Sequence, residues 1–145
     1  MTELSSETIH ASCVAIGDAA VLIEGKSGAG KSDLALRLID RGARLVSDDY
    51  TIVTRQHGVL LARAPVNLSG KIEVRGIGIV AMEPVADVAV RLIVAIDDAP
   101  PRMPERGQRR RFAGVDIAEI ALAALEPSAP IKVELALLQP PDAAR

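Results

Sequence analysis

Short apolar runs, separated by glycine or charged turn residues, dominate the chain. The run at 11–16 (ASCVAI) and the run at 20–24 (AVLIE) flank a Gly-Asp turn, which predicts a β-hairpin. Residues 50–64 alternate between apolar and polar and turn at His57-Gly58, which predicts a second hairpin. The β-branched run at 85–97 predicts a strand in the interior of a sheet. We therefore expect a fold dominated by sheet.

One segment has the spacing of a helix. Its apolar residues stand among charged positions between 31 and 41, and Gly42 follows as a natural helix end. Residues 43–49 (ARLVSDD) then predict a short strand that ends in two acids. Residues 65–82 begin rich in glycine and become apolar. Residues 98–112 hold three prolines and the run Arg109, Arg110 and Arg111, and they predict a loop.

The C-terminal third carries weaker signals. Residues 116–127 have a helical composition, but their apolar spacing also permits a strand. Residues 130–138 (PIKVELALL) alternate and predict a strand, and the remaining residues predict a frayed tail. The order of strand, loop, helix and then mostly strands predicts a single α/β domain over residues 1–145 that is rich in sheet. It lacks the regular βαβα alternation of a doubly wound fold.

Composition excludes several classes of function. The 145 residues carry a net charge of −2, so no basic surplus favours nucleic acid or an anionic membrane as a partner. With one Tyr, one Phe and no Trp, the chain lacks the stacking platforms of single-strand nucleic-acid binders. We see no signal peptide and no apolar run of the roughly 18 residues that a membrane span needs. The single Cys13 indicates a reducing, cytoplasmic location, and a small apolar strand residue is favoured over a nucleophile there.

A phosphate-binding loop is the clearest chemical motif. It fits the pattern G-x-x-x-x-G-K-[ST], with an apolar strand before it and a helix after it. Glycines let the backbone approach phosphates, the exposed N–H groups form an anion-binding nest, and the helix dipole adds to the attraction. The lysine reaches the β- and γ-phosphates, and the last hydroxyl can bind Mg²⁺. The motif comprises Gly25, Lys26, Ser27, Gly28, Ala29, Gly30, Lys31 and Ser32.

Two adjacent acids follow the predicted helix. Asp48 and Asp49 end the next strand, and a parallel position beside the loop strand would place them near the phosphates. An acid here either holds Mg²⁺, as in many nucleotide hydrolases, or accepts the proton of an attacking hydroxyl. A simple turn or helix-cap pair is the third alternative. The loop establishes that phosphate binds, but the acids alone leave their role open.

The segment GKSGAGKSDLALRLIDRGARLVSDD, together with IEVRGIGIV at 72–80, resembles the catalytic domain of the HPr kinase/phosphorylase family. His10 also stands 21 residues before Lys31, the spacing of a histidine in that family. The resemblance implies a fold related to phosphoenolpyruvate carboxykinase, and it favours a strand for residues 119–125. It further implies ATP and Mg²⁺ as cofactors and phosphorylation of a serine of an HPr-type phosphocarrier protein. Many members also remove this phosphate with inorganic phosphate, releasing pyrophosphate.

The resemblance assigns roles residue by residue. Asp48 matches the catalytic base, His10 matches a histidine near it, and Arg102 is similar to an arginine on a mobile loop, with Arg106 as its rival. Ser32, Asp49 and Glu73 match the metal-side residues, and the other loop residues match the phosphate site. Arg75 lies in the same segment as Glu73, and both share one face if that segment is extended.

The resemblance covers nearly all of this chain but only the core of a typical member. We expect no additional N-terminal domain before His10 and no C-terminal helix after the last predicted strand. The family also implies a homo-oligomer. Two other functions stay open on the residues alone: a small-metabolite kinase that uses the same phosphate loop, and a nucleotide-sensing module without turnover.

Overall fold

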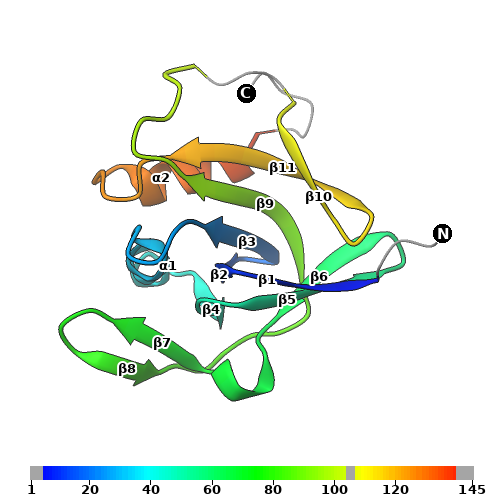
Figure 1. The fold of residues 1–145 in the computed structure, drawn as a ribbon, viewed down its shortest axis with the longest axis horizontal. Helices are drawn as coiled ribbons and strands as arrows, with labels where there is room; N and C mark the ends of the chain where they lie inside the picture. Colours follow the sequence, from blue (N-terminus) through cyan, green and yellow to red (C-terminus); the bar gives the residue numbers. More distant parts are fainter. Residues whose placement is uncertain (1–4, 104–106, 140–145) are drawn as a thin grey trace.

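A curved sheet of nine strands carries most of the chain (Figure 1). The computed structural model describes residues 5–103 and 107–139. Two helices and a separate two-stranded sheet complete the described part of the fold. The strands of the large sheet are β1 (Ser6–Ile9), β2 (Ala11–Ile16), β3 (Ala19–Glu24), β4 (Arg44–Ser47), β5 (Thr51–Gln56), β6 (Val59–Arg63), β9 (Val88–Ile96), β10 (Arg109–Phe112) and β11 (Val115–Leu122).

Strand β9 occupies the centre of this sheet. The strand order is β1-β5-β6-β9-β3-β2-β4, with β10 and β11 joined to it through β9. One edge of β9 pairs parallel with β3, while its other edge pairs with β6 near the start and with β11 toward the end. The prediction of an interior strand at 85–97 is confirmed. The sheet-rich α/β class is confirmed as well, without regular βαβα alternation.

Both predicted hairpins are present. Strands β2 and β3 pair antiparallel around the turn at Gly17, whose φ is 63°. Strands β5 and β6 pair around His57 and Gly58, with φ of 52° and 78°. Two successive positive φ angles match the right-handed twist of the paired strands, so His57 has a turn role here.

The two faces of the large sheet bury different apolar clusters. On one face the side chains of β2, β3 and β9 pack against β5 and β6, around Leu22, Val53 and Ile93. On the other face they pack against the two helices, around Val21, Leu34 and Val94. Aliphatic side chains dominate both clusters, and the one Phe of the chain, Phe112, belongs to the first.

Helix α1 (Lys31–Asp40) confirms the helix predicted at 31–41. Leu34, Ala35 and Leu38 are fully buried on its inner face, which follows the i, i+4 spacing of a helix packed on a sheet. Gly42 follows with φ of 112° and donates its N–H to Ile39, so glycine ends the helix as expected.

The strand predicted at 130–138 is wrong, because the chain forms helix α2 (Ala129–Leu137) there. Ala129 and Val133 are buried against the sheet, while Ile131 and Leu135 are exposed. Because apolar residues occupy both faces of this helix, their spacing fits the alternation of a strand as well as the period of a helix. Helix α2 therefore follows β11, the last strand of the described residues, and the strand favoured for 119–125 is confirmed as far as Leu122.

Residues 109–112 are also corrected, from loop to strand β10. This strand pairs antiparallel with β11 through the two-residue turn Ala113-Gly114, whose φ angles are 48° and 82°. The pairing fixes Arg109, Arg110 and Arg111 on a sheet edge.

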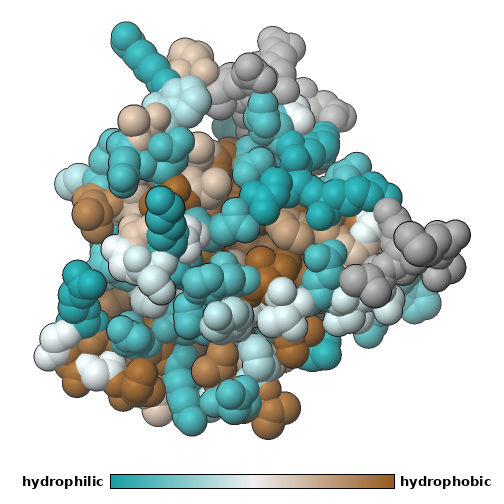
Figure 2. Space-filling view, in the orientation of Figure 1, coloured by the Kyte–Doolittle hydropathy of each residue, from teal (hydrophilic) through white to brown (hydrophobic). Residues whose placement is uncertain are grey.

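The segment at 65–82 forms a small hairpin beside α1. After a 3₁₀ turn at Val66–Leu68, β7 (Lys71–Val74) pairs antiparallel with β8 (Gly78–Ala81). Ile72 is fully buried against α1, whereas Ile77 and Ile79 are exposed at the far end of the hairpin. The β7-β8 hairpin lies at the lower left of Figure 1, and apolar side chains gather in that region of the surface in Figure 2. No helix in the described ranges is long and apolar enough to cross a membrane.

Leu38→Ala should lower the free energy of unfolding by about 2–5 kcal/mol, because it opens a cavity between α1 and the sheet. Leu138→Ala removes the same atoms from a side chain that is 78% exposed, and we expect a change within about 0.5 kcal/mol. Urea denaturation of both variants measures the difference. Equal losses would contradict the assignment of Leu38 to the core.

Candidate functional site

The phosphate-binding loop connects the end of β3 to the start of α1. Gly28 and Gly30 have φ of 81° and 104°, a region in which glycine is favoured over other residues. A Cβ built on Gly28 would meet nothing within 4 Å, so the loop faces open space there. A Cβ on Gly25 would lie 3.1 Å from Cβ of Ile96, so this glycine is needed for close packing against β9.

The Lys31 side chain lies across the same loop. Its Nζ donates to the carbonyl oxygens of Gly25 at 2.9 Å and Lys26 at 3.2 Å. The residue is buried, with 6% of its surface exposed. The ammonium group is thus held at the mouth of the loop, where an arriving phosphate oxygen can replace a carbonyl as its partner.

The carboxylate of Asp48 is buried and accepts three hydrogen bonds. Its Oδ1 receives Ser12 Oγ at 2.8 Å and Ser32 Oγ at 2.7 Å, and its Oδ2 receives the Glu73 N–H at 2.9 Å. These donors come from β2, α1 and β7, so three elements meet at one group. With two lone pairs per oxygen, this arrangement leaves one acceptor position on Oδ2.

The route by which Asp48 reaches the loop differs from the expectation. Strand β4 does not lie beside β3, because β2 stands between them and pairs antiparallel with both. Strand β4 still runs in the same direction as β3, so both strands end at the same edge of the sheet. Asp48 spans the remaining distance and bonds to Ser32 at the start of α1.

Asp49 turns away from Asp48. Its backbone has φ of 69°, and its carboxylate pairs with His10 Nε2 at 2.9 Å, with both side chains about half exposed. The His10 ring also stacks on Tyr50, with ring centroids 4.8 Å apart. His10 therefore contacts Asp49, the neighbour of the residue it was expected to accompany.

Glu73 takes part in the site through its backbone. Its N–H donates to Asp48, whereas its side chain is exposed on β7 and Arg75 is exposed in the turn that follows. Among the described residues, no group of three or more His, Cys, Asp or Glu side chains gathers as a metal site. Two oxygens that could bind a metal, Ser32 Oγ and Asp48 Oδ1, lie 2.7 Å apart.

The arginine-rich segment is only partly near the site. Arg102 is exposed, and Arg106 lies outside the described residues. Arg110 instead forms two hydrogen bonds to Glu24, at 2.9 and 3.0 Å, and a third to Glu119 at 3.1 Å. The bonds to Glu24 raise the pKa of the Arg110 guanidinium above its usual range, against the effect of its partial burial. Arg110 thus fixes the last residue of β3, from which the phosphate loop starts.

Sequence reasoning missed Ser12 and Tyr50. Ser12 is fully buried and was passed over as part of an apolar run, although a polar residue in such a run requires a partner. Tyr50 follows the two acids directly. Cys13, by contrast, has the core position expected for it, and burial raises the pKa of its thiol well above the usual range.

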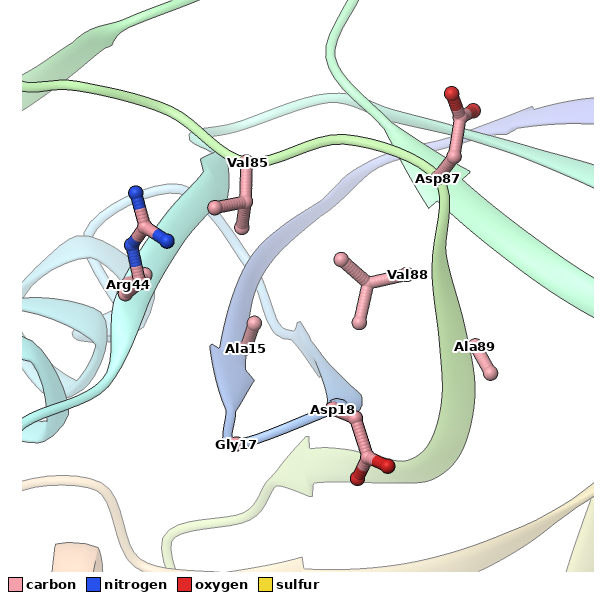
Figure 3. Close-up of a pocket in the computed structure, with 8 residues that line it drawn as sticks. All are labelled: Ala15, Gly17, Asp18, Arg44, Val85, Asp87, Val88 and Ala89. Atoms are coloured by element: carbon pink, nitrogen blue, oxygen red, sulfur yellow. The ribbon is translucent and has the colours of Figure 1, made fainter.

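The two described cavities lie away from the loop. One, of about 230 Å³, opens at the Gly17-Asp18 turn, at the opposite end of β3 (Figure 3). Arg44 and Asp87 lie on its rim. The other, of about 500 Å³, lies between the sheet edge and the C-terminal end of α2. Neither contains a residue of the predicted site.

Comparison with known proteins agrees with this geometry. The HPr Serine kinase C-terminal domain family matches residues 2–123. An HPr kinase/phosphorylase of Lactiplantibacillus plantarum is 35% identical over 129 residues, which cover 80% of this chain and 41% of that protein. One from Clostridium acetobutylicum is 47% identical over 79 residues, 54% of this chain and 26% of that protein. The chain thus spans less than half the length of these relatives.

A solved structure shares the fold. The Hpr(Ser) kinase/phosphatase from Coxiella burnetii superposes with a TM-score of 0.75 at 28% sequence identity. The match covers 89% of this chain and 92% of that one. The fold expected from the sequence is therefore confirmed.

Ser12→Ala should lower the free energy of unfolding by about 1–3 kcal/mol, because it removes a donor to Asp48 and leaves the Asp49 N–H without its acceptor. Ser69→Ala, at an exposed serine, should change it by less than about 0.5 kcal/mol. Urea denaturation at neutral pH compares the two. If Ser12→Ala were as stable as Ser69→Ala, the buried network would not contribute as described.

Proposed function

This chain belongs to the family of the HPr Serine kinase C-terminal domain, and on that premise we propose that it transfers the γ-phosphoryl group of ATP to a serine of an HPr-type phosphocarrier protein. One observation carries the proposal: the buried Asp48 carboxylate lies against Ser32, at the mouth of the phosphate loop. A small-metabolite kinase would share the loop, but the family match over residues 2–123 favours the protein acceptor. A module that senses nucleotide without turnover would not need the buried carboxylate of Asp48 as a base.

The loop residues fit a nucleoside triphosphate. The free space in front of Gly28 and the N–H groups of the loop suit the β- and γ-phosphates. The Nζ of Lys31 already lies among loop oxygens and would exchange them for phosphate oxygens of opposite charge. The dipole of α1 favours negative charge at the same point.

Asp48 is proposed as the base. Its remaining lone pair on Oδ2 accepts the proton of the serine hydroxyl as the serine oxygen bonds to the γ-phosphorus. The bond from that phosphorus to the bridging oxygen breaks at the same time, and ADP leaves. The bonds from Ser12, Ser32 and Glu73 hold the carboxylate in place during the step. In the reverse direction Asp48 accepts a proton from inorganic phosphate, whose oxygen bonds to the phosphorus of phosphoserine. The bond from that phosphorus to the serine oxygen breaks, the proton passes to the serine oxygen, and pyrophosphate is released.

The oxygen donors also fit Mg²⁺. Ser32 Oγ and Asp48 Oδ1 lie 2.7 Å apart and are hard oxygen ligands, and Mg²⁺ typically uses few protein ligands together with phosphates and water. When bound, the ion would neutralise charge that develops on the phosphates. Ser32 is the proposed protein ligand, and Glu73 and Asp49 are proposed as metal-side carboxylates because they match such residues of the family.

The remaining assignments are part of the same proposal. His10 and Asp49 form an exposed pair next to Asp48, a suitable position for contact with the acceptor protein. Arg102 is proposed to approach the transferring phosphoryl group from its loop, in the manner of an arginine finger. We further propose a homo-oligomer and a cytoplasmic location, as the family resemblance and the lone Cys13 suggest.

Asp48→Asn should retain ATP binding and reduce transfer by about 10²- to 10⁴-fold, because the amide cannot accept the serine proton. Asp40→Asn, the same change at the far, exposed end of α1, should transfer at the native rate. The assay combines ATP, Mg²⁺ and a purified HPr-type carrier, with phosphoserine measured by mass spectrometry. Native transfer by Asp48→Asn would refute the base assignment, and absence of phosphoserine with the wild-type protein would refute the function.

Ser32→Ala should raise the Mg²⁺ concentration for half-maximal transfer by about tenfold, because it removes a metal ligand and a donor to Asp48. Ser27→Ala, an exposed serine of the same loop, serves as the control and should keep the native Mg²⁺ dependence. Titrating Mg²⁺ after removal of metal with EDTA gives both values. Equal Mg²⁺ dependence in the two variants would exclude Ser32 as the ligand.

A further inference from the structure

Three parallel strands bring three loops to one edge of the sheet. Strands β3, β9 and β11 are parallel neighbours, and their arrowheads point the same way in Figure 1. In register, Glu24 lies opposite Ala95, and Leu122 lies opposite Ile96, so all three strands end at the same level. Ligands of α/β sheets bind at the carboxyl ends of such strands. The loop after β11 therefore belongs to the surroundings of the phosphate loop.

This loop, at residues 123–127, touches the phosphate loop directly. A Cβ built on Gly30 would lie 3.3 Å from Cβ of Ala124 and 3.5 Å from Cδ2 of Leu125. Gly30 is the last residue before α1. In the sheet, β9 and β11 lie on one side of β3, whereas β2 and β4, which leads to Asp48, lie on the other. A nucleotide whose γ-phosphate faces Asp48 would direct its nucleoside toward Leu125.

Arg37 anchors the backbone of the 123–127 loop to α1. Its guanidinium donates to the carbonyl oxygens of Ala124 and Glu126, the second at 3.1 Å, and to Asp33 Oδ2 at 2.9 Å. Lys132 of α2 also pairs with Glu126 at 2.7 Å. A loop tied by several polar contacts presents its side chains in a fixed position, which reduces the entropy lost when a ligand binds.

Leu125 is the apolar side chain that this loop presents. It is 78% exposed although it lies next to Gly30, whereas the adjacent Ala124 is 3% exposed. The site thus combines a phosphate cradle with an apolar surface held next to it. The purine base of ATP is a flat aromatic ring with apolar faces, joined to the phosphates through the ribose. A base that covered Leu125 would remove apolar area from water.

We propose that Leu125 forms the surface on which the base of the nucleotide rests, and that Arg37 is a positioning residue for it. This inference rests on the proposed function, because it assumes that a nucleotide occupies the phosphate loop. It separates two parts of the site: Lys31 and the glycines bind phosphate, and the 123–127 loop recognises the nucleoside.

The test compares two ligands by titration calorimetry, ATP and inorganic tripolyphosphate, both with Mg²⁺. Leu125→Ser should weaken ATP binding by about tenfold and leave tripolyphosphate binding unchanged, because only ATP carries a base. Leu125→Met should retain native affinity for ATP, since it keeps the apolar surface. Leu138→Ser is the matched control, because Leu138 is also 78% exposed and lies away from the loop.

Other variants separate this inference from the proposed function. Lys31→Ala should weaken both ligands, and Arg37→Met should weaken ATP alone. Native ATP affinity in Leu125→Ser, or an equal loss for both ligands, would overturn the base surface while leaving the kinase proposal intact. Absence of binding of either ligand to the wild-type protein would overturn both.

Discussion

The hydrogen bonding of one buried carboxylate, that of Asp48, determines how the parts of this protein meet. A charged group removed from water is costly unless several donors satisfy it. Asp48 obtains these donors from β2, from the first turn of α1 and from β7. The positions of these three elements relative to one another are therefore constrained by their hydrogen bonds to Asp48. The same contacts that compensate the buried charge also hold the phosphate loop beside an acid.

The sheet makes this junction possible through the position of β9. Because β9 pairs with β3 on one edge and with both β6 and β11 on the other, the sheet can branch and cover two apolar clusters. The parallel strands deliver their loops to one edge, and the antiparallel β2 returns Ser12 to that edge from the other side. Arg110 on β10 fixes Glu24, so even the arginine-rich edge of the sheet supports the start of the phosphate loop.

Sequence patterns predicted correctly those parts of the fold, such as turns and a helix end, whose conformation depends on neighbouring residues alone. Glycine turns specified both hairpins, and Gly42 specified the end of α1. Residues 130–138 failed because their apolar positions fit two periods, although Ser128 and Pro130 form a helix-start signal. The loop predicted for residues 109–112 was wrong because three consecutive arginines are typical of a solvent-exposed segment. The two positive φ angles at Ala113-Gly114 instead form the turn of a hairpin. The position of β2 between β3 and β4 depends on long-range pairing, which no local pattern encodes.

The two acids after β4 were ambiguous in sequence because adjacent residues of one type carry the same local signal. Their separation depends on Ser12, whose hydroxyl donates to Asp48 Oδ1 at 2.8 Å and accepts the Asp49 N–H at 3.1 Å. This pair of bonds holds Asp48 inward, while the left-handed φ of Asp49 turns its carboxylate out to His10. The segment at 72–80 then contributes the backbone N–H of Glu73, which donates to Asp48 Oδ2 at 2.9 Å. A polar residue within an apolar strand and one backbone amide thus give two identical neighbours different environments, which is the physical basis for assigning them different roles.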